Sequence, residues 1–285
     1  MELLRRHREL LSACYHGCNH DSYEFYSPEA TRTRYRPRPL PDQRRMLEHA
    51  VELARRFRQE RGVDLDRVMV FPHGVGPEEI FPDMHRLGFL GTCNYGDKYP
   101  PGSTAPEDLD LGLRPADLAW AGFPLLWRRD IEDGGYLLDL LLGRPLLTFA
   151  HTESLGADFG PFAERAARIN EATRGGATWC GLDEIARHAY LQRRRPDGSW
   201  EVLMTTNEAC LHNPDVRARS VLIRRPHLPS GDFFEVDGER RPDSAAVTVP
   251  GRGIAVVRLV GDGPAPALPG RSRCSIFRSA QGDMA

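Results

Sequence analysis

Residues 11–20 read Leu-Ser-Ala-Cys-Tyr-His-Gly-Cys-Asn-His, and this stretch does most to decide the fold. Residues 11–15 form a short apolar run that predicts a buried strand, and residues 16–20 form the polar run that follows it. Gly17 and Asn19 argue against a helix, so we expect His16 and His20 to lie in one loop. Two imidazoles four residues apart can bind one metal ion. The alternative is two loop histidines that donate hydrogen bonds to backbone carbonyls.

Strand, loop and helix patterns alternate from this stretch to about residue 185. Further strands are predicted at 68–72, 89–93 and 146–150, and helices at 46–61, 77–88, 131–143 and 159–173. Such repetition is typical of parallel βα units, whose functional loops follow the carboxyl ends of the strands. His16, His73 and His151 each fall at a predicted strand end. We therefore expect these three histidines at one edge of a parallel sheet.

After Ile185 the hydrophobic period changes to two. Short apolar strands are predicted at 201–205, 221–223, 233–236, 246–249 and 254–257. This pattern favours a small antiparallel β-sandwich. The expected organisation is an α/β region over 1–188, the β-sandwich over 189–262, and a disordered tail over 263–285 that is rich in Pro, Gly, Ser and Arg.

Composition excludes several classes of protein. The 285 residues carry a net charge of −2, and Lys98 is the single lysine among 38 basic residues, so we expect no nucleic-acid partner. No apolar run approaches the roughly 18–20 residues of a membrane span. Charges at residues 1–7 argue against a signal peptide, which predicts a cytoplasmic protein. The six cysteines form no zinc-binding set of four, and we expect reduced thiols.

The order of these motifs resembles the polysaccharide deacetylases of carbohydrate esterase family 4, also called NodB-homology proteins. The resemblance covers about residues 10–185. It rests first on His16 and His20, which match a His-(Ser/Thr)-x-x-His zinc motif with Gly17 at the hydroxyl position. It implies an α/β fold, an irregular (β/α) barrel, and Zn²⁺ or another divalent metal held by these two histidines.

The two later motifs of the family match less completely. Pro72 and Gly74 fit an Arg-x-Pro-(Tyr/Phe)-Gly pattern, but Val70 stands at the arginine position and His73 at the aromatic position. A strand that ends in Leu-x-His resembles the segment that ends at His151. The resemblance implies that His151 is the general acid and that residues 72–74 line the substrate site.

The first motif of the family, Thr-Phe-Asp-Asp, is not found. Only 15 residues precede His16, and none of them is aspartate. The chain therefore resembles a family member without its first βα segment. We expect an incomplete barrel whose open edge allows oligomerisation. Asp21 is the one nearby carboxylate, and we interpret it as a loop or helix-cap residue.

These observations predict a carbohydrate-active hydrolase that removes acyl groups from an amino sugar or polysaccharide, and so cleaves a C–N bond other than a peptide bond. The substrate-binding candidates are Pro72, His73, Gly74, Asn94 and Tyr95, and the metal-binding candidates are His16 and His20. One alternative is an inactive barrel that binds a glycan. Another is a glycoside hydrolase on a related barrel, which would need two carboxylates roughly 5–10 Å apart.

Overall fold

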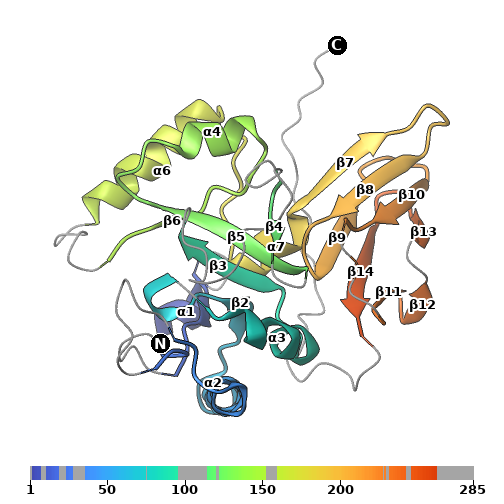
Figure 1. Cartoon of the computed structure of the whole chain (residues 1–285). Helices are drawn as coiled ribbons and strands as arrows, with labels where there is room; N and C mark the ends of the chain where they lie inside the picture. The colour runs from blue at the N-terminus through green and yellow to red at the C-terminus, as the bar shows by residue number, and fades with distance from the viewer. Residues whose placement is uncertain are drawn as a thin grey trace.

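A computed structural model describes residues 2–7, 11–18, 24–27, 36–74, 76–95, 114–119, 122–151, 159–226, 228, 231–241 and 245–261. Figure 1 shows a twisted sheet with helices around it, and two smaller sheets formed by the C-terminal third of the chain. The fold is mixed α/β, as the sequence predicts. None of the described helices is both long enough and apolar enough to cross a membrane.

The first sheet is largely parallel. Its strands are β1 (Ala13–Tyr15), β2 (Leu65–Met69), β3 (Gly91–Tyr95), β4 (Asp117–Ala119), β5 (Phe123–Asp130) and β6 (Thr148–Phe149). The order is β1-β2-β3-β5-β4, and β6 also pairs with β5. Only β4 is antiparallel to its neighbour. The carboxyl ends of β1, β2, β3, β5 and β6 therefore share one edge of the sheet, which we call the carboxyl edge.

Closure of this sheet into a barrel stays a prediction. Among the described residues, β1 pairs only with β2, and β6 pairs only with β5. Strands β4 and β5 are not among the predicted strands. The predicted strands at 68–72 and 89–93 correspond to β2, which begins three residues earlier, and to β3, which begins two residues later.

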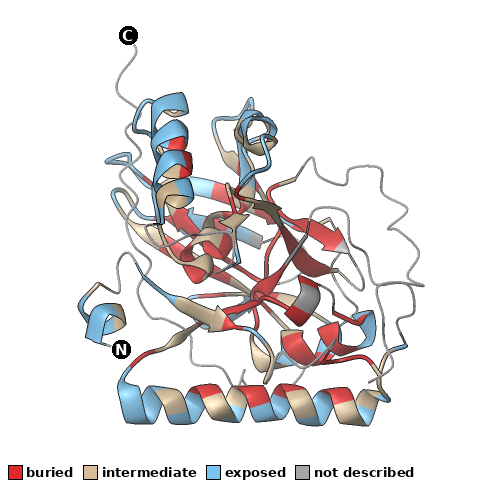
Figure 2. Cartoon of the chain, turned by 90° about the vertical axis from the view of Figure 1, so that its left-hand side faces the viewer, coloured by how far each residue is buried: buried red, intermediate tan, exposed pale blue. Residues whose placement is uncertain are grey.

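The helices cover both faces of the parallel sheet. They are α1 (Glu2–Arg6), α2 (Leu40–Arg61), α3 (Phe81–Leu87), α4 (Tyr136–Leu141), α6 (Gly160–Ala172) and α7 (Leu182–His188), with short 3-10 turns η1 (Pro72–Gly74) and η2 (Glu78–Ile80). Helix α2 buries Leu47, Ala50 and Ala54 and exposes its opposite side, as Figure 2 shows. It ends at Gly62, whose φ of 68° an L side chain rarely adopts.

Alternating side chains give the parallel sheet two apolar faces. Met69 and Phe71 belong to a core with Phe81 of α3 and with Phe123. Val68 belongs to a second core on the other face, with residues of β5 and α7. The chain is therefore packed on both sides of β2, which is why the central strand contains so many fully buried residues.

The C-terminal region forms two four-stranded sheets around a third core. One has the order β13-β10-β8-β7 and the other β12-β11-β14-β9. The strands are β7 (Tyr190–Arg194), β8 (Trp200–Met204), β9 (Glu208–His212), β10 (Arg219–Arg224), β11 (Phe233–Val236), β12 (Glu239–Arg241), β13 (Ala245–Val249) and β14 (Ile254–Val260). The pairing of β8 with β10 is parallel, so the prediction of a purely antiparallel sandwich is wrong there.

A buried cluster of ion pairs connects these sheets to the parallel sheet. Glu208 of β9 is 2% exposed, and its carboxylate lies 3.2 Å from Arg67 of β2, 2.6 Å from Arg187 of α7 and 2.9 Å from Arg258 of β14. Burial alone would raise the pKa of Glu208, but these three guanidinium groups lower it below its ordinary value. Asp183 of α7 also pairs with Arg67.

The cysteines follow the sequence prediction in part. Cys14, Cys18, Cys93 and Cys180 are free thiols. Cys210 of β9 is disulfide-bonded, so the expectation of reduced thiols is wrong at this position. The predicted tail over 263–285 lies outside the described residues.

Candidate functional site at the carboxyl edge

His16 follows the last residue of β1 and lies at the carboxyl edge. Its Nδ1 atom is 2.6 Å from the carbonyl oxygen of Val70, the first residue after β2. A carbonyl oxygen only accepts, so Nδ1 carries the proton and donates it. In a neutral imidazole the lone pair then belongs to Nε2. Metal-binding histidines usually have this arrangement, with one nitrogen donating to a carbonyl and the other facing the ion.

The residues after His16 are held by a buried carboxylate. Glu24 is 2% exposed, and its two oxygens lie 2.8 and 3.0 Å from the backbone nitrogen of Cys18, which donates to them. The thiol of Cys18 donates to the carbonyl of Met46 in α2 at 3.1 Å. Burial, followed by the charge of Glu24, raises the pKa of Cys18 to about 12. This thiol is therefore protonated and structural near neutral pH.

The geometry explains why glycine occupies position 17. Gly17 has a φ of 74°, and a Cβ atom there would lie 1.8 Å from Oε2 of Glu24 and 3.1 Å from Cγ of Pro72. The serine or threonine found in the motif that this segment resembles would not fit. Gly17 also brings two predicted motifs together, because it packs directly against the Pro72 turn.

The second motif forms the 3-10 turn η1 (Pro72–Gly74) at the end of β2. Pro72 is buried, and Gly74 has a φ of 74°. Val70, at the position where the family has arginine, takes part through its backbone carbonyl, which accepts from His16. The structure describes the backbone of His73 in this turn, and its side chain lies outside the described residues.

The remaining predicted residues occupy the same edge. Asn94 and Tyr95 are the last residues of β3, and their side chains lie outside the described residues. His151 is exposed, two residues beyond β6, with its ring 5.8 Å from that of Phe149 in an edge-to-face contact. The guanidinium of Arg128 in β5 lies 4.5 Å from the centre of the Phe149 ring. His16 and His151 thus follow the first and last parallel strands.

Two predicted residues, His20 and Asp21, lie outside the described residues. Within the part of the chain that the structure describes, no three His, Cys, Asp or Glu side chains are grouped so that they could hold a metal ion. The described residues therefore supply one candidate nitrogen, Nε2 of His16, whose lone pair follows from the bond of Nδ1 to Val70. That nitrogen fits one position of a metal site, and the other ligands would have to include His20.

Sequence reasoning did not single out Glu24 or Arg128 for a role at this edge. The role of Glu24 depends on a loop that brings its carboxylate back to Cys18, and no local sequence pattern predicts the path of this loop. Arg128 belongs to β5, which the sequence analysis missed. The alternation of buried Leu125 and Trp127 on one face of the sheet with Leu126 on the other is the signal that would have located this strand.

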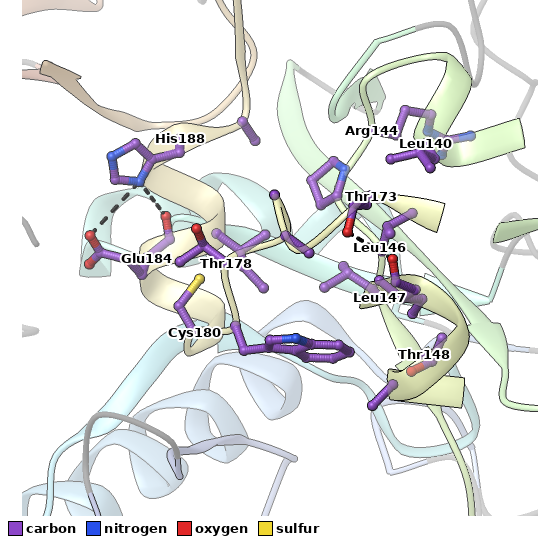
Figure 3. A pocket seen from close by; sticks show the side chains of 18 of the residues that line it. Leu140, Arg144, Leu146, Leu147, Thr148, Thr173, Thr178, Cys180, Glu184 and His188 are labelled. Carbon is purple, nitrogen blue, oxygen red and sulfur yellow. Dashed lines mark hydrogen bonds and ion pairs between the residues drawn. The ribbon is translucent and has the colours of Figure 1, made fainter. Parts of the chain in front are cut away.

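A groove of about 980 Å³ lies between α7, α6 and the segment that leads into β6 (Figure 3). Most of its described lining is apolar, and none of that lining is a predicted site residue. Glu184 and His188 of α7 contribute the polar part of one wall, with Nδ1 of His188 2.9 Å from the carbonyl of Glu184. Burial, the largest influence, lowers the pKa of His188, which is therefore neutral near pH 7.

Comparisons of the chain with protein-family models, with curated proteins and with solved structures find no match.

Proposed function

We propose that this chain is a carbohydrate-active hydrolase that removes acyl groups from an amino sugar or polysaccharide. The observation that carries the proposal is the position and tautomer of His16, which projects from the carboxyl edge with Nδ1 bonded to Val70. The same edge carries the Pro72 turn, the end of β3 and His151. We further propose that the parallel sheet belongs to an irregular (β/α) barrel and that residues 189–262 form a separate domain.

The proposal assigns distinct tasks to the residues at this edge. His16 and His20 would hold Zn²⁺ or another divalent ion, and the bond from His16 to Val70 would orient the ring for that role. When bound, such an ion supplies a Lewis acid for the acyl carbonyl and lowers the pKa of water. His151 would give a proton to the departing amine. Pro72, His73, Gly74, Asn94 and Tyr95 would contact the sugar.

A second candidate is a glycan-binding barrel without turnover. It is favoured by one observation, that Val70 stands where the resembled family has arginine and takes part at this edge through its backbone carbonyl, which accepts from His16. In this alternative the edge residues bind the sugar, and His16 and His151 make hydrogen bonds. Both candidates place a carbohydrate partner at the same edge, and we propose the open side of the parallel sheet as one surface for self-association.

Acetate release from N-acetylglucosamine oligomers separates the two candidates. The assay compares the wild type with and without added Zn²⁺, and with the variants His16→Ala and His151→Ala. His49→Ala is the matched control, because His49 is exposed on α2. The hydrolase predicts metal-dependent acetate release that falls at least ~100-fold in both site variants and is unchanged in the control. Oligomer binding without acetate release supports the second candidate, and neither binding nor release contradicts both.

A further inference from the structure

Helix α4 (Tyr136–Leu141) has an inverted amphipathic pattern. Its polar residue Asp139 is 6% exposed and pairs with Arg129 and with Arg144, the latter at 3.4 Å. Its leucines face outward, with Leu137 53%, Leu138 52% and Leu141 81% exposed. Surface helices normally bury the apolar side and expose the charged side. The burial of Asp139 fixes the orientation of α4, so the leucines are turned away from the core of their own chain.

Helix α4 also contributes one residue to the groove beside β6. Leu140, the next apolar residue around α4, lines the groove, which has Phe162 and Ile169 of α6 and Leu147 on its other walls. Two large exposed aromatic side chains belong to the same region: Trp179 (47% exposed) lines the groove, and Phe159 (62% exposed) lies just before α6. The indole nitrogen of Trp179 donates to Asn170 of α6 at 3.0 Å, which holds the ring against this helix.

We propose that this surface, defined as Leu137, Leu138, Leu141, Phe159, Trp179 and the groove, binds a second copy of the chain. Figure 1 shows α4 and α6 together on the side of the sheet away from the sandwich. The surface contains both projecting leucines and a groove of matching chemistry. A two-fold axis would place the leucines of each copy in the groove of the other.

The size of the surface agrees with this occupant. From their exposed fractions, the five large side chains present roughly 500–600 Å² together, since a large apolar side chain covers on the order of 150–250 Å². With the groove walls added, the area approaches the roughly 800 Å² that each partner contributes to a standard interface. The largest apolar patch on a typical monomer covers about 300–600 Å² and is often a site of interaction.

The inference does not rest on the proposed function, because the surface lies on α4 and α6 and not on an open edge of the parallel sheet. Its readout is the mass of the particle in solution, which is independent of acetate release. A dimer without turnover would support the interface while contradicting the hydrolase, and an active monomer would do the reverse.

Analytical ultracentrifugation of the whole chain over a range of concentrations tests the interface. The variants Leu141→Glu and Leu137→Glu place a carboxylate in it, and each substitution counts twice across the two-fold axis. Val216→Glu is the matched control, because Val216 is 73% exposed in the β-sandwich region. Thermal unfolding of each variant confirms that the exposed substitution leaves the fold intact.

We expect a wild-type dimer, a rise of at least ~100-fold in the dissociation constant of both leucine variants, and a control equal to the wild type. A wild type that stays monomeric at the highest attainable concentration overturns the proposal. So does a dimer that survives both leucine substitutions, or one that the control disrupts equally.

Discussion

Glu24 gives the His16 loop its shape, because its carboxylate accepts twice from the backbone of Cys18 and is almost fully buried. Moving it to make room for a side chain at position 17 would break these bonds. The sequence alone shows Gly17 only as a departure from the motif that the segment resembles. The structure gives the steric reason for this departure, because the carboxylate of Glu24 leaves no space for a side chain at position 17.

Substituting this glycine tests the requirement. Gly17→Ala combines an unfavourable φ with a collision against Glu24, whereas Gly62→Ala has a φ of 68° with open space around it. We expect the free energy of unfolding to fall by about 1 kcal/mol in Gly62→Ala and by about 3 kcal/mol in Gly17→Ala. Urea titrations followed by circular dichroism measure both values. Equal losses would show that the carboxylate is not fixed.

Buried thiols make folding sensitive to alkaline pH. Burial, and secondly Asp66, raises the pKa of Cys14 from 9.0 to about 11, and burial raises that of Cys93 to about 12. A raised pKa means that the folded chain holds these protons more tightly, so stability is complete below pH 9 and falls as the pH rises toward 11–12. Urea titrations at pH 8 and pH 10.5 should show this fall. The loss should be smaller in a Cys14→Ala/Cys93→Ala variant, and an equal loss there would refute the assignment.

At the scale of elements, the sequence predicts best those features, such as helix ends, that depend on neighbouring residues in the chain. The ends of α2 and α3 were expected at Gly62 and Gly88, and the structure caps both helices there because glycine adopts positive φ. The position of His16, the Pro72 turn and His151 along one edge follows from the parallel direction of β1, β2 and β6. Strand β5 was not predicted, because Pro124 and the charged end of the strand interrupt its apolar pattern. Its pairing with β3, β4 and β6 is also non-local.

Side-chain contacts between distant elements are a second feature of the fold that local sequence patterns do not predict. Glu208 of β9 joins β2, α7 and β14 through three arginines, and Arg187 is completely buried beside it. A charged residue in a predicted strand gives no sign of partners so distant in the sequence. The cluster places the sandwich sheets on the parallel sheet, and it predicts a large effect of a single substitution.

Removing this carboxylate should destabilise the whole chain. Glu208→Ala leaves Arg187 and Arg67 buried without their main counter-charge, and we expect a loss of about 3–5 kcal/mol in the free energy of unfolding. Glu239→Ala removes an exposed partner of Arg241 and should cost less than about 1 kcal/mol. Denaturant titrations compare the two. A small loss in Glu208→Ala would mean that the cluster does not hold the sheets together.

At the scale of the whole molecule, the chain combines a parallel sheet packed on both faces with a two-sheet region fastened to one side. The carboxyl edge carries the described residues of the proposed site, and the proposed interface on α4 and α6 is a separate apolar surface. The sequence predicts the two regions and the change between them near residue 189, where β7 begins at Tyr190. Barrel closure and the partners of His16 depend on contacts between residues far apart in the sequence, which local patterns do not predict.

The metal content of the purified chain tests the central claim most directly. Elemental analysis after dialysis with Zn²⁺ would compare the wild type with His16→Ala, His20→Ala and the control His49→Ala. The account predicts about one zinc ion per folded wild-type and control chain, and loss of the ion from both site variants. A folded wild type without bound metal, or zinc retained when His16 is replaced, would contradict it.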